Sequence, residues 1–193
     1  MPRPREFDKS AALDAAIVCF WQRGYEATSV RDLADGMGIS GPSLYNCFGN
    51  KHALFVQALE RYLDRGMRAR VARLESTLPP KQAVRRFFDE IIERSVNDRE
   101  RRGCLLINSA LEVAPHDPEL GQVIADRLGE IEAFFYRSIR AAQAAGAVPE
   151  QRNARDVSRL LLGVLLGLRV LARSKPDRAL LQGVARPALA MLE

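Results

Sequence analysis

The sequence predicts an all-α protein, with an N-terminal three-helix domain, a C-terminal helical domain and about nine helices in total. Apolar residues recur with a period near 3.6 along most of the chain. No segment shows the strict alternation or the Val, Ile and Thr density of a β-strand. With 193 residues, 47% of them apolar and 27% charged, the chain also has the composition of an ordinary globular protein with a buried core.

The first three helices are predicted from their capping residues. Asp8 can cap a first helix that ends before Gly24, and Thr28 can cap a short second helix. After a Gly-Ile turn, Ser40 can cap a third helix that runs to about Phe48. We therefore expect three short helices in the first fifty residues.

The C-terminal helices follow from the same signals. Asn50 can cap a long fourth helix that continues into the arginine-rich stretch 65–73, and Pro79-Pro80 ends it and begins a fifth helix. Further helices are expected after Gly103, over roughly 118–145, over about 153–173 and over about 177–192.

Composition narrows the class of protein. The longest nearly uninterrupted apolar run, Leu160 to Leu168, is about half the length that spans a bilayer, and the N-terminus lacks the apolar stretch of a signal peptide. We therefore expect a cytoplasmic protein with no membrane partner. Three dispersed cysteines and two histidines predict no disulfide framework, no metal site and no cofactor.

The net charge of +5 does not lie in the N-terminal region. Residues 1–60 carry six basic and seven acidic side chains, whereas residues 61–103 carry twelve and seven. A nucleic-acid surface in the first sixty residues must therefore depend on where single cations lie, with Arg3 and Arg5 as a flexible arm and acids such as Asp14 turned away.

Residues 28–51 have the pattern of a helix-turn-helix, whose second helix enters the DNA major groove. Apolar residues of both short helices can pack together, which leaves a small, polar face on the second helix. On that face Ser43 and Asn46 can bond to base edges, Tyr45 can reach a phosphate or a thymine methyl, and Lys51 can hold a phosphate. The candidate DNA-binding residues are Thr28, Ser29, Arg31, Ser40, Gly41, Pro42, Ser43, Tyr45, Asn46 and Lys51. The alternative is a polar turn between core helices, with Ser43 and Asn46 merely solvated.

The run from about Lys9 to Phe55 combines a set of short elements at fixed spacing. They are Phe20, Gly24-Tyr25, Thr28-Ser29-Val30, Leu33-Ala34, Gly38-Ile39-Ser40, Leu44-Tyr45, Phe48, Lys51 and Leu54. This run resembles the N-terminal DNA-binding domain of the TetR family of bacterial transcriptional regulators. One departure is Asn46, where the family often has His, and Cys47 follows it. The segment GCLLINSALEVAPHDPEL also resembles a subset of the family.

The resemblance implies a DNA-binding domain over 1–50 and a ligand-binding and dimerisation domain over 51–193. It further implies a homodimer that binds a palindromic double-stranded operator and represses transcription until a small-molecule effector shifts the fourth helix. The residues themselves identify neither the effector nor the operator.

The penultimate helix carries an apolar stripe that suggests a dimer interface. The stripe lies beside Gly163 and Gly167, which would allow another backbone to approach closely, and burial inside one chain is the alternative. The stripe consists of Val157, Leu161, Val164, Leu168 and Leu171.

A ligand pocket is expected among the C-terminal helices, although the same residues could simply form the core. The candidates are Phe87, Phe88, Ile91, Cys104, Leu105, Asn108, Ser109, Glu112, Phe134 and Phe135. Cys104 follows two arginines near a predicted helix N-terminus, so it is either a thiol sensor of electrophiles or oxidants or a small buried side chain.

The sequence also bears on two classes of function other than regulation. The chain has no Walker A, GxGxxG, HExxH or GxSxG motif, so we expect no enzyme. A helical dimeric interaction protein without DNA binding remains the alternative of a different class.

Overall fold

The computed structural model describes residues 8–193, so Arg3 and Arg5 of the expected arm lie outside the described part. All regular secondary structure within that part is helical, which confirms the all-α prediction. The α-helices are α1 (Lys9–Arg23), α2 (Val30–Met37), α3 (Gly41–Phe48), α4 (Lys51–Leu63), α5 (Ala69–Thr77), α6 (Pro80–Val96), α7 (Leu105–Glu112), α8 (Pro118–Ala144), α9 (Ala154–Ser174) and α10 (Arg178–Leu189). A π-helical segment, η1 (Asp64–Arg68), joins α4 to α5, and a short 3₁₀ turn, η2 (Ala190–Leu192), follows α10.

Side-chain caps place the ends of the N-terminal helices. The side chains of Asp8, Ser40 and Asn50 cap α1, α3 and α4, as predicted. The prediction that Thr28 caps the second helix is wrong. Ser29 is the cap instead, because Asp32 three residues later completes a capping box with it.

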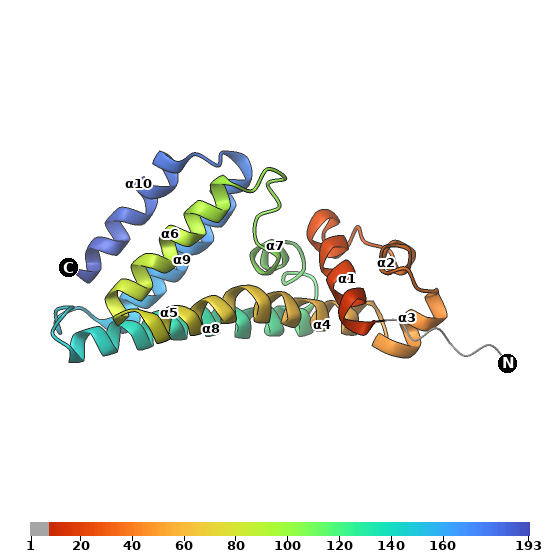
Figure 1. The fold of residues 1–193 in the computed structure, drawn as a ribbon, viewed down its shortest axis with the longest axis horizontal. Helices are drawn as coiled ribbons and strands as arrows, with labels where there is room; N and C mark the ends of the chain where they lie inside the picture. The colour runs from red at the N-terminus through yellow and green to blue at the C-terminus, as the bar shows by residue number, and fades with distance from the viewer. Residues whose placement is uncertain (1–7) are drawn as a thin grey trace.

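The long fourth helix continues into the arginine-rich stretch, as predicted, but through the π-helical segment. Counted as one continuous helix, α4, η1 and α5 bring the helices of residues 8–193 to nine. Arg68 in the segment donates to Glu60, Asp64 and Glu130, which ties it to α4 and α8. This helix extends from beneath α1 along the length of the molecule beside α8 (Figure 1).

Four phenylalanines form the centre of the C-terminal core. Phe87 and Phe88 of α6 and Phe134 and Phe135 of α8 are fully buried and pack ring against ring, with centroids 5.3–5.8 Å apart. Such clusters add to the stability that burial alone provides.

The short helix α7 occupies the middle of the molecule. It contacts α4, α8 and α9, and it lies between the α1–α3 group and the bundle of α6, α9 and α10 (Figure 1). Since α4 also packs against α1, the division at residue 50 stays a prediction. No helix within residues 8–193 has the length and hydrophobicity that crossing a bilayer requires.

Candidate DNA-binding surface and ligand cavity

Helix α3 has one face in the core and one face open to solvent. Leu44 and Phe48 are buried on the side where α3 packs against α2 and α4, whereas Pro42, Tyr45 and Asn46 are exposed. Tyr45 is 52% exposed, which leaves its ring and hydroxyl accessible. The open face therefore carries an aromatic ring and an amide side by side on a rigid helix.

The first turn of α3 is held by its serines. The Ser43 backbone N–H donates to Ser40 Oγ at 3.2 Å, and the two hydroxyls lie 2.9 Å apart. Gly41 and Pro42 follow the cap without adding bulk. The turn can thus approach another surface closely, while its serine hydroxyls keep free hydrogen-bonding capacity.

The side chains flanking α3 differ in how far they are available. The Arg31 side chain is 91% exposed and pairs only loosely with Asp35, at 3.8 Å. Lys51 lies over the Tyr25 ring at 4.4 Å and donates to the Glu26 carbonyl at 3.4 Å, so it must swing out to bind a phosphate.

Thr28 and Ser29 serve the fold of the free protein. Thr28 is fully buried and its hydroxyl donates to the Gly24 carbonyl, which removes it from the candidate surface. Ser29 is exposed but bonds to Asp32. Those bonds, together with the Arg23 guanidinium, lower the pKa of Asp32 to about 2.

The acidic side chain of Asp14 on α1 pairs with arginines that lie outside α3. Asp14 accepts hydrogen bonds from Arg61 at 2.7 Å and from Arg65 at 2.5 Å, both on the α4–η1 side. The hydrogen bond from Arg61 is the largest influence that lowers the pKa of Asp14. The weakly acidic charge of the first sixty residues is therefore partly neutralised away from the open face.

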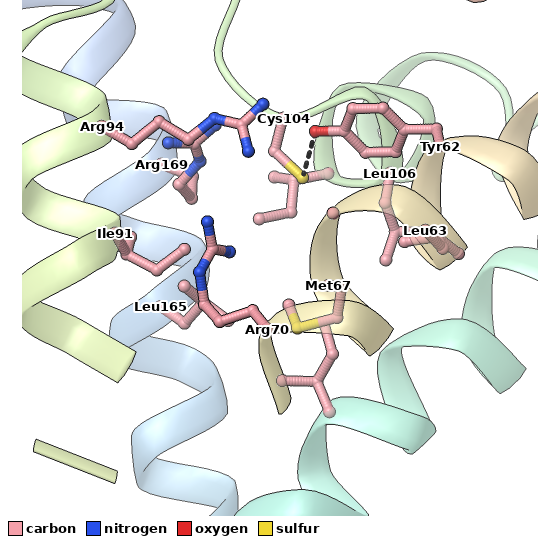
Figure 2. A pocket seen from close by; sticks show the side chains of 13 residues that line it. Tyr62, Leu63, Met67, Arg70, Ile91, Arg94, Cys104, Leu106, Leu165 and Arg169 are labelled. Carbon is pink, nitrogen blue, oxygen red and sulfur yellow. Dashed lines mark hydrogen bonds between the residues drawn. The ribbon is translucent and has the colours of Figure 1, made fainter. Parts of the chain in front are cut away.

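A cavity lies where α4, η1, α5, α6, α7, α8 and α9 meet, and Ile91 and Cys104 are the predicted pocket residues that line it (Figure 2). Its volume is about 40 Å³, which holds about three water molecules. Tyr62 donates its hydroxyl hydrogen bond to Cys104 Sγ at 3.8 Å, and burial raises the pKa of Tyr62. The complete lining is Tyr62, Leu63, Gly66, Met67, Arg70, Ile91, Arg94, Cys104, Leu106, Ile107, Ile131, Leu165 and Arg169.

The other predicted pocket residues lie elsewhere. The four phenylalanines fill the core, Leu105 is buried, and Ser109 donates to the Leu105 carbonyl. Asn108 donates to the Arg102 carbonyl at 2.8 Å. The expectation that these residues line the cavity is corrected. The phenylalanines of α6 and α8 pack against one another instead, and the α7 residues Ser109 and Asn108 bond to backbone carbonyls.

Glu112 also lies outside the cavity, at the junction with the N-terminal helices. Its carboxylate accepts the Glu26 backbone N–H at 3.0 Å. A Cβ added to Gly24 would lie 2.5 Å from the Glu112 carboxylate, which is too close for both to keep their positions. Helix α7 thus contacts the cavity at Cys104 and the α1–α2 loop at Glu112.

Sequence reasoning missed the arginines of the cavity. Arg169 directly follows Leu168 and comes four residues after Leu165, so it shares the buried face of α9 with them, and this placement of a cation on a buried face was an available signal. Arg70 and Arg94 could not be assigned in the same way, since they join the site only through the packing of α5 and α6.

The apolar stripe of α9 is divided by the structure. Val157, Leu161 and Leu168 are buried inside the chain, so the expectation that they form a dimer face is corrected. Val164 and Leu171 are only partly buried. The face left open carries Leu160 and Val170, each 44% exposed, with Gly163 and Gly167 between them.

The fold and the α2–α3 unit together define a helix-turn-helix regulator of transcription. Residues 12–58 match the family described as "Bacterial regulatory proteins, tetR family", and residues 80–187 match "Tetracyclin repressor-like, C-terminal domain". The chain therefore belongs to the TetR family of bacterial transcriptional regulators.

Two relatives that match this chain over nearly their whole length are also HTH-type transcriptional regulators. The uncharacterized HTH-type transcriptional regulator YezE of Bacillus subtilis is 34% identical over 100% of both chains. The HTH-type transcriptional repressor ComR of Escherichia coli is 30% identical over 97% of this chain and 90% of its own.

Solved structures agree in fold. A cysteine mutant of the TetR family transcriptional regulator CifR, complexed with 26 bp double-strand operator DNA, has a TM-score of 0.89 and 32% identity over 100% of both chains. A TetR transcriptional regulator from Chloroflexus aurantiacus, at 19% identity and a TM-score of 0.83 over 94% of this chain and 91% of its own, shares the fold.

Proposed function

We propose that this protein is a homodimeric repressor that binds a palindromic operator through α3 and is released by a small-molecule effector. The observation that carries the proposal is the open face of α3, on the fold of a relative, CifR, whose cysteine mutant was solved in complex with operator DNA. In the proposed complex Tyr45 and Asn46 enter the major groove.

Phosphate contacts would fix the register of α3 on the duplex. Arg31 is free enough to reach a backbone phosphate, and Lys51 can leave the Tyr25 ring for one. Ser40, Gly41, Pro42 and Ser43 form the slim turn nearest the DNA, and the exposed Ser29 lies at the start of α2. Because few cations are involved, non-specific affinity should be modest and should fall with salt.

Dimerisation would use the open faces of α9 and α10. Gly163 and Gly167 leave room for a second backbone, since nothing lies within 4 Å of a Cβ placed on either. On α10, Gly183 is exposed and Val184 is only partly buried, which continues the small, apolar surface. Two such faces would form a four-helix interface, and the two-fold axis would set two α3 helices on successive half-sites.

Effector binding would act through the elements that join the cavity to the N-terminal helices. Tyr62 of α4 lines the cavity and its ring contacts Trp21 of α1, with centroids 5.1 Å apart. Helix α7 makes the second link, from Cys104 to Glu112. A ligand that occupies the cavity would change how α4 and α7 pack around it, and movement of either helix would shift α3.

The first test is selection of bound duplexes from a random library at two salt concentrations. An enriched palindrome would support the proposal, and Tyr45→Ala should weaken binding to it more than ten-fold, about 1.4 kcal/mol or more, with unchanged helical content. No enrichment by folded, dimeric protein would favour a helical interaction protein that does not bind DNA.

A thiol sensor is the second candidate, because the Cys104 sulfur lines the cavity and is partly buried there. Treatment with N-ethylmaleimide should release the protein from DNA, and Cys104→Ser should abolish that release. Cys47 is exposed on α3 and could react with the reagent as well. The protein that keeps Cys104 and the Cys104→Ser variant should therefore both carry Cys47→Ser. Release that persists without Cys104 would exclude this mechanism.

A further inference from the structure

Three guanidinium groups converge on the cavity from three different helices. Arg70 of α5, Arg94 of α6 and Arg169 of α9 all line it, and Figure 2 shows their guanidinium groups turned toward the space beside Cys104. None of the lining residues is acidic. The cavity therefore has a positive wall, whereas an ordinary core cavity of this size has apolar walls.

Arg169 is the most deeply placed of the three cations. It is 5% exposed, and it donates to the Ser95 hydroxyl at 2.8 Å and to the Gly103 carbonyl. Both partners are neutral, so its hydrogen bonds are satisfied while its charge is not. A buried cation without a counter-ion is costly, and an anion in the cavity would remove that cost.

Arg94 and Arg70 add to the uncompensated charge. Within residues 8–193, the Arg94 side chain forms neither a hydrogen bond nor an ion pair. Arg70 pairs with Glu90 at 3.2 Å, but Glu90 also accepts hydrogen bonds from Arg73 and Arg86. Burial, followed by repulsion from Arg94, lowers the pKa of Arg70, as expected where cations crowd together.

The rest of the lining sets the size and polarity of the ligand. Figure 2 shows Met67 and Leu106 across the cavity from Arg94 and Arg169, which gives it an apolar side and a cationic side. A ligand therefore needs one anionic end and one apolar end. With a volume of about 40 Å³, the cavity suits only a short chain. Tyr62 offers a hydroxyl at the same place.

A surface groove provides the entry path. It has a volume of about 420 Å³, and Arg94 and Arg169 line both the groove and the cavity. Arg99 and Arg102 also line the groove, together with Asp98 and Glu100, so that its four arginines exceed its acidic residues by two. A small anion would therefore be attracted to the groove and would pass between Arg94 and Arg169.

We propose that the cavity binds a short-chain aliphatic carboxylate, with its carboxylate held between Arg94 and Arg169 and its alkyl end against the apolar side. This inference rests on the proposed function, since it gives a chemical class to the effector. Charge-assisted hydrogen bonds from guanidinium to carboxylate supply the selectivity for the anion. The occupant would be the counter-ion that Arg169 lacks within the protein.

The fluorescence of Trp21 can report binding in the cavity. It is the single tryptophan of the chain, it contacts Tyr62 of the cavity, and the Arg102 guanidinium lies 4.6 Å from its ring. Trp21 emission of the full-length protein, without DNA, would be titrated with propionate, with the neutral isostere propionamide and with inorganic phosphate.

Propionate should change the emission in a saturable way, and propionamide should not. Arg94→Gln should weaken propionate binding at least ten-fold, whereas Arg99→Gln, which alters the groove but not the cavity, should weaken it less than two-fold. No saturable change with propionate, an equal response to propionamide, equal losses in both variants, or a response to phosphate alone would each overturn the proposal.

The effector role is tested separately on selected operator DNA. If propionate binds in the Arg94-dependent way but leaves operator affinity unchanged, the carboxylate site stands and its role as the release signal fails. If the operator is bound normally but propionate is not, the carboxylate inference fails while DNA-binding regulation stands.

Discussion

At the scale of single residues, the start of α2 depends on a carboxylate that works only when it is ionised. The Asp32 carboxylate accepts hydrogen bonds from the Ser29 backbone N–H, at 2.9 Å, and from the Ser29 hydroxyl. It also forms an ion pair with Arg23. These contacts lower its pKa from 3.8 to about 2. The contribution of Asp32 to stability is therefore complete above about pH 4 and is lost as the pH falls toward 2.

Asp32→Asn should remove the part of the acid destabilisation that Asp32 causes. The unfolding midpoint of the native protein should fall more steeply between pH 4 and 2 than that of the variant, because only the native side chain must gain a proton. Thermal unfolding by circular dichroism at several pH values would measure the difference. Asp35→Asn is the matched control on the same helix, and an effect as large as that of Asp32→Asn would contradict the assignment.

The residues that sequence reasoning placed correctly are those whose roles are local. Asp8, Ser40 and Asn50 cap helices that begin one residue later, and such caps can be predicted from a few neighbours. Thr28 was misplaced because it and Ser29 can both cap a helix. The choice depends on Asp32, which completes the capping box with Ser29, and on the buried bond from Thr28 to Gly24.

The cavity could not be predicted in the same way because its parts come from distant segments. Cys104 and Ile91 were anticipated as apolar or reactive groups, but the cations that define the site belong to α5, α6 and α9. Phe87 and Phe134 looked equally suitable and instead fill the core. Periodicity predicts which face of a helix is buried, but not whether that face meets a core or a cavity.

At the scale of elements, α7 and the π-helical segment are the parts that connect the two halves. Gly66 and Met67 of η1 line the cavity, and π-helical turns within α-helices occur frequently at functional sites. No sequence signal distinguished this segment from ordinary α-helix, since Gly66 fits both. Helix α7 is docked to the α1–α2 loop by the single carboxylate of Glu112.

The docking of α7 can be measured with a double-mutant cycle on Gly24 and Glu112. Gly24 has a φ of +85°, so Gly24→Ala should destabilise the protein by about 1–2 kcal/mol in any background. With Glu112 present, the new Cβ also displaces the carboxylate from the Glu26 N–H, which should add about 1 kcal/mol. Urea unfolding of the four proteins would give the coupling energy.

The Glu112→Ala background should remove only the second of these costs. A loss on Gly24→Ala that is the same with and without Glu112 would show that the contact contributes no stability. A coupling energy near 1 kcal/mol would show that α7 and the N-terminal helices unfold as connected parts.

At the scale of the whole molecule, the proposed palindromic operator has two half-sites, and one chain could bind only one of them. Its α3 presents a single recognition helix, while its α9 and α10 leave an apolar face with small residues uncovered. Leu168 is unsuitable for testing dimerisation because it is fully buried, and changing it would test folding. Leu160 and Val170 are the suitable positions, since each is 44% exposed in the single chain.

The double substitution Leu160→Glu with Val170→Glu should give a folded monomer. Two carboxylates from each chain would be buried across the two-fold interface without counter-ions. Burying these four charges costs more free energy than leaving the face exposed to water in the monomer. Leu111→Glu is the matched control, since Leu111 is 65% exposed on α7, away from this face. Analytical ultracentrifugation at micromolar protein should show a monomer for the double variant and a dimer for the control.

The same pair of proteins links assembly to DNA binding. The monomer should lose at least a hundred-fold in affinity for the full palindrome, because a dimer binds its second half-site without a further loss of translational freedom. Its affinity for an isolated half-site should match that of the control. A double variant that stays dimeric would place the interface elsewhere, and a monomer that binds the palindrome as tightly as the dimer would show that the two α3 helices act independently.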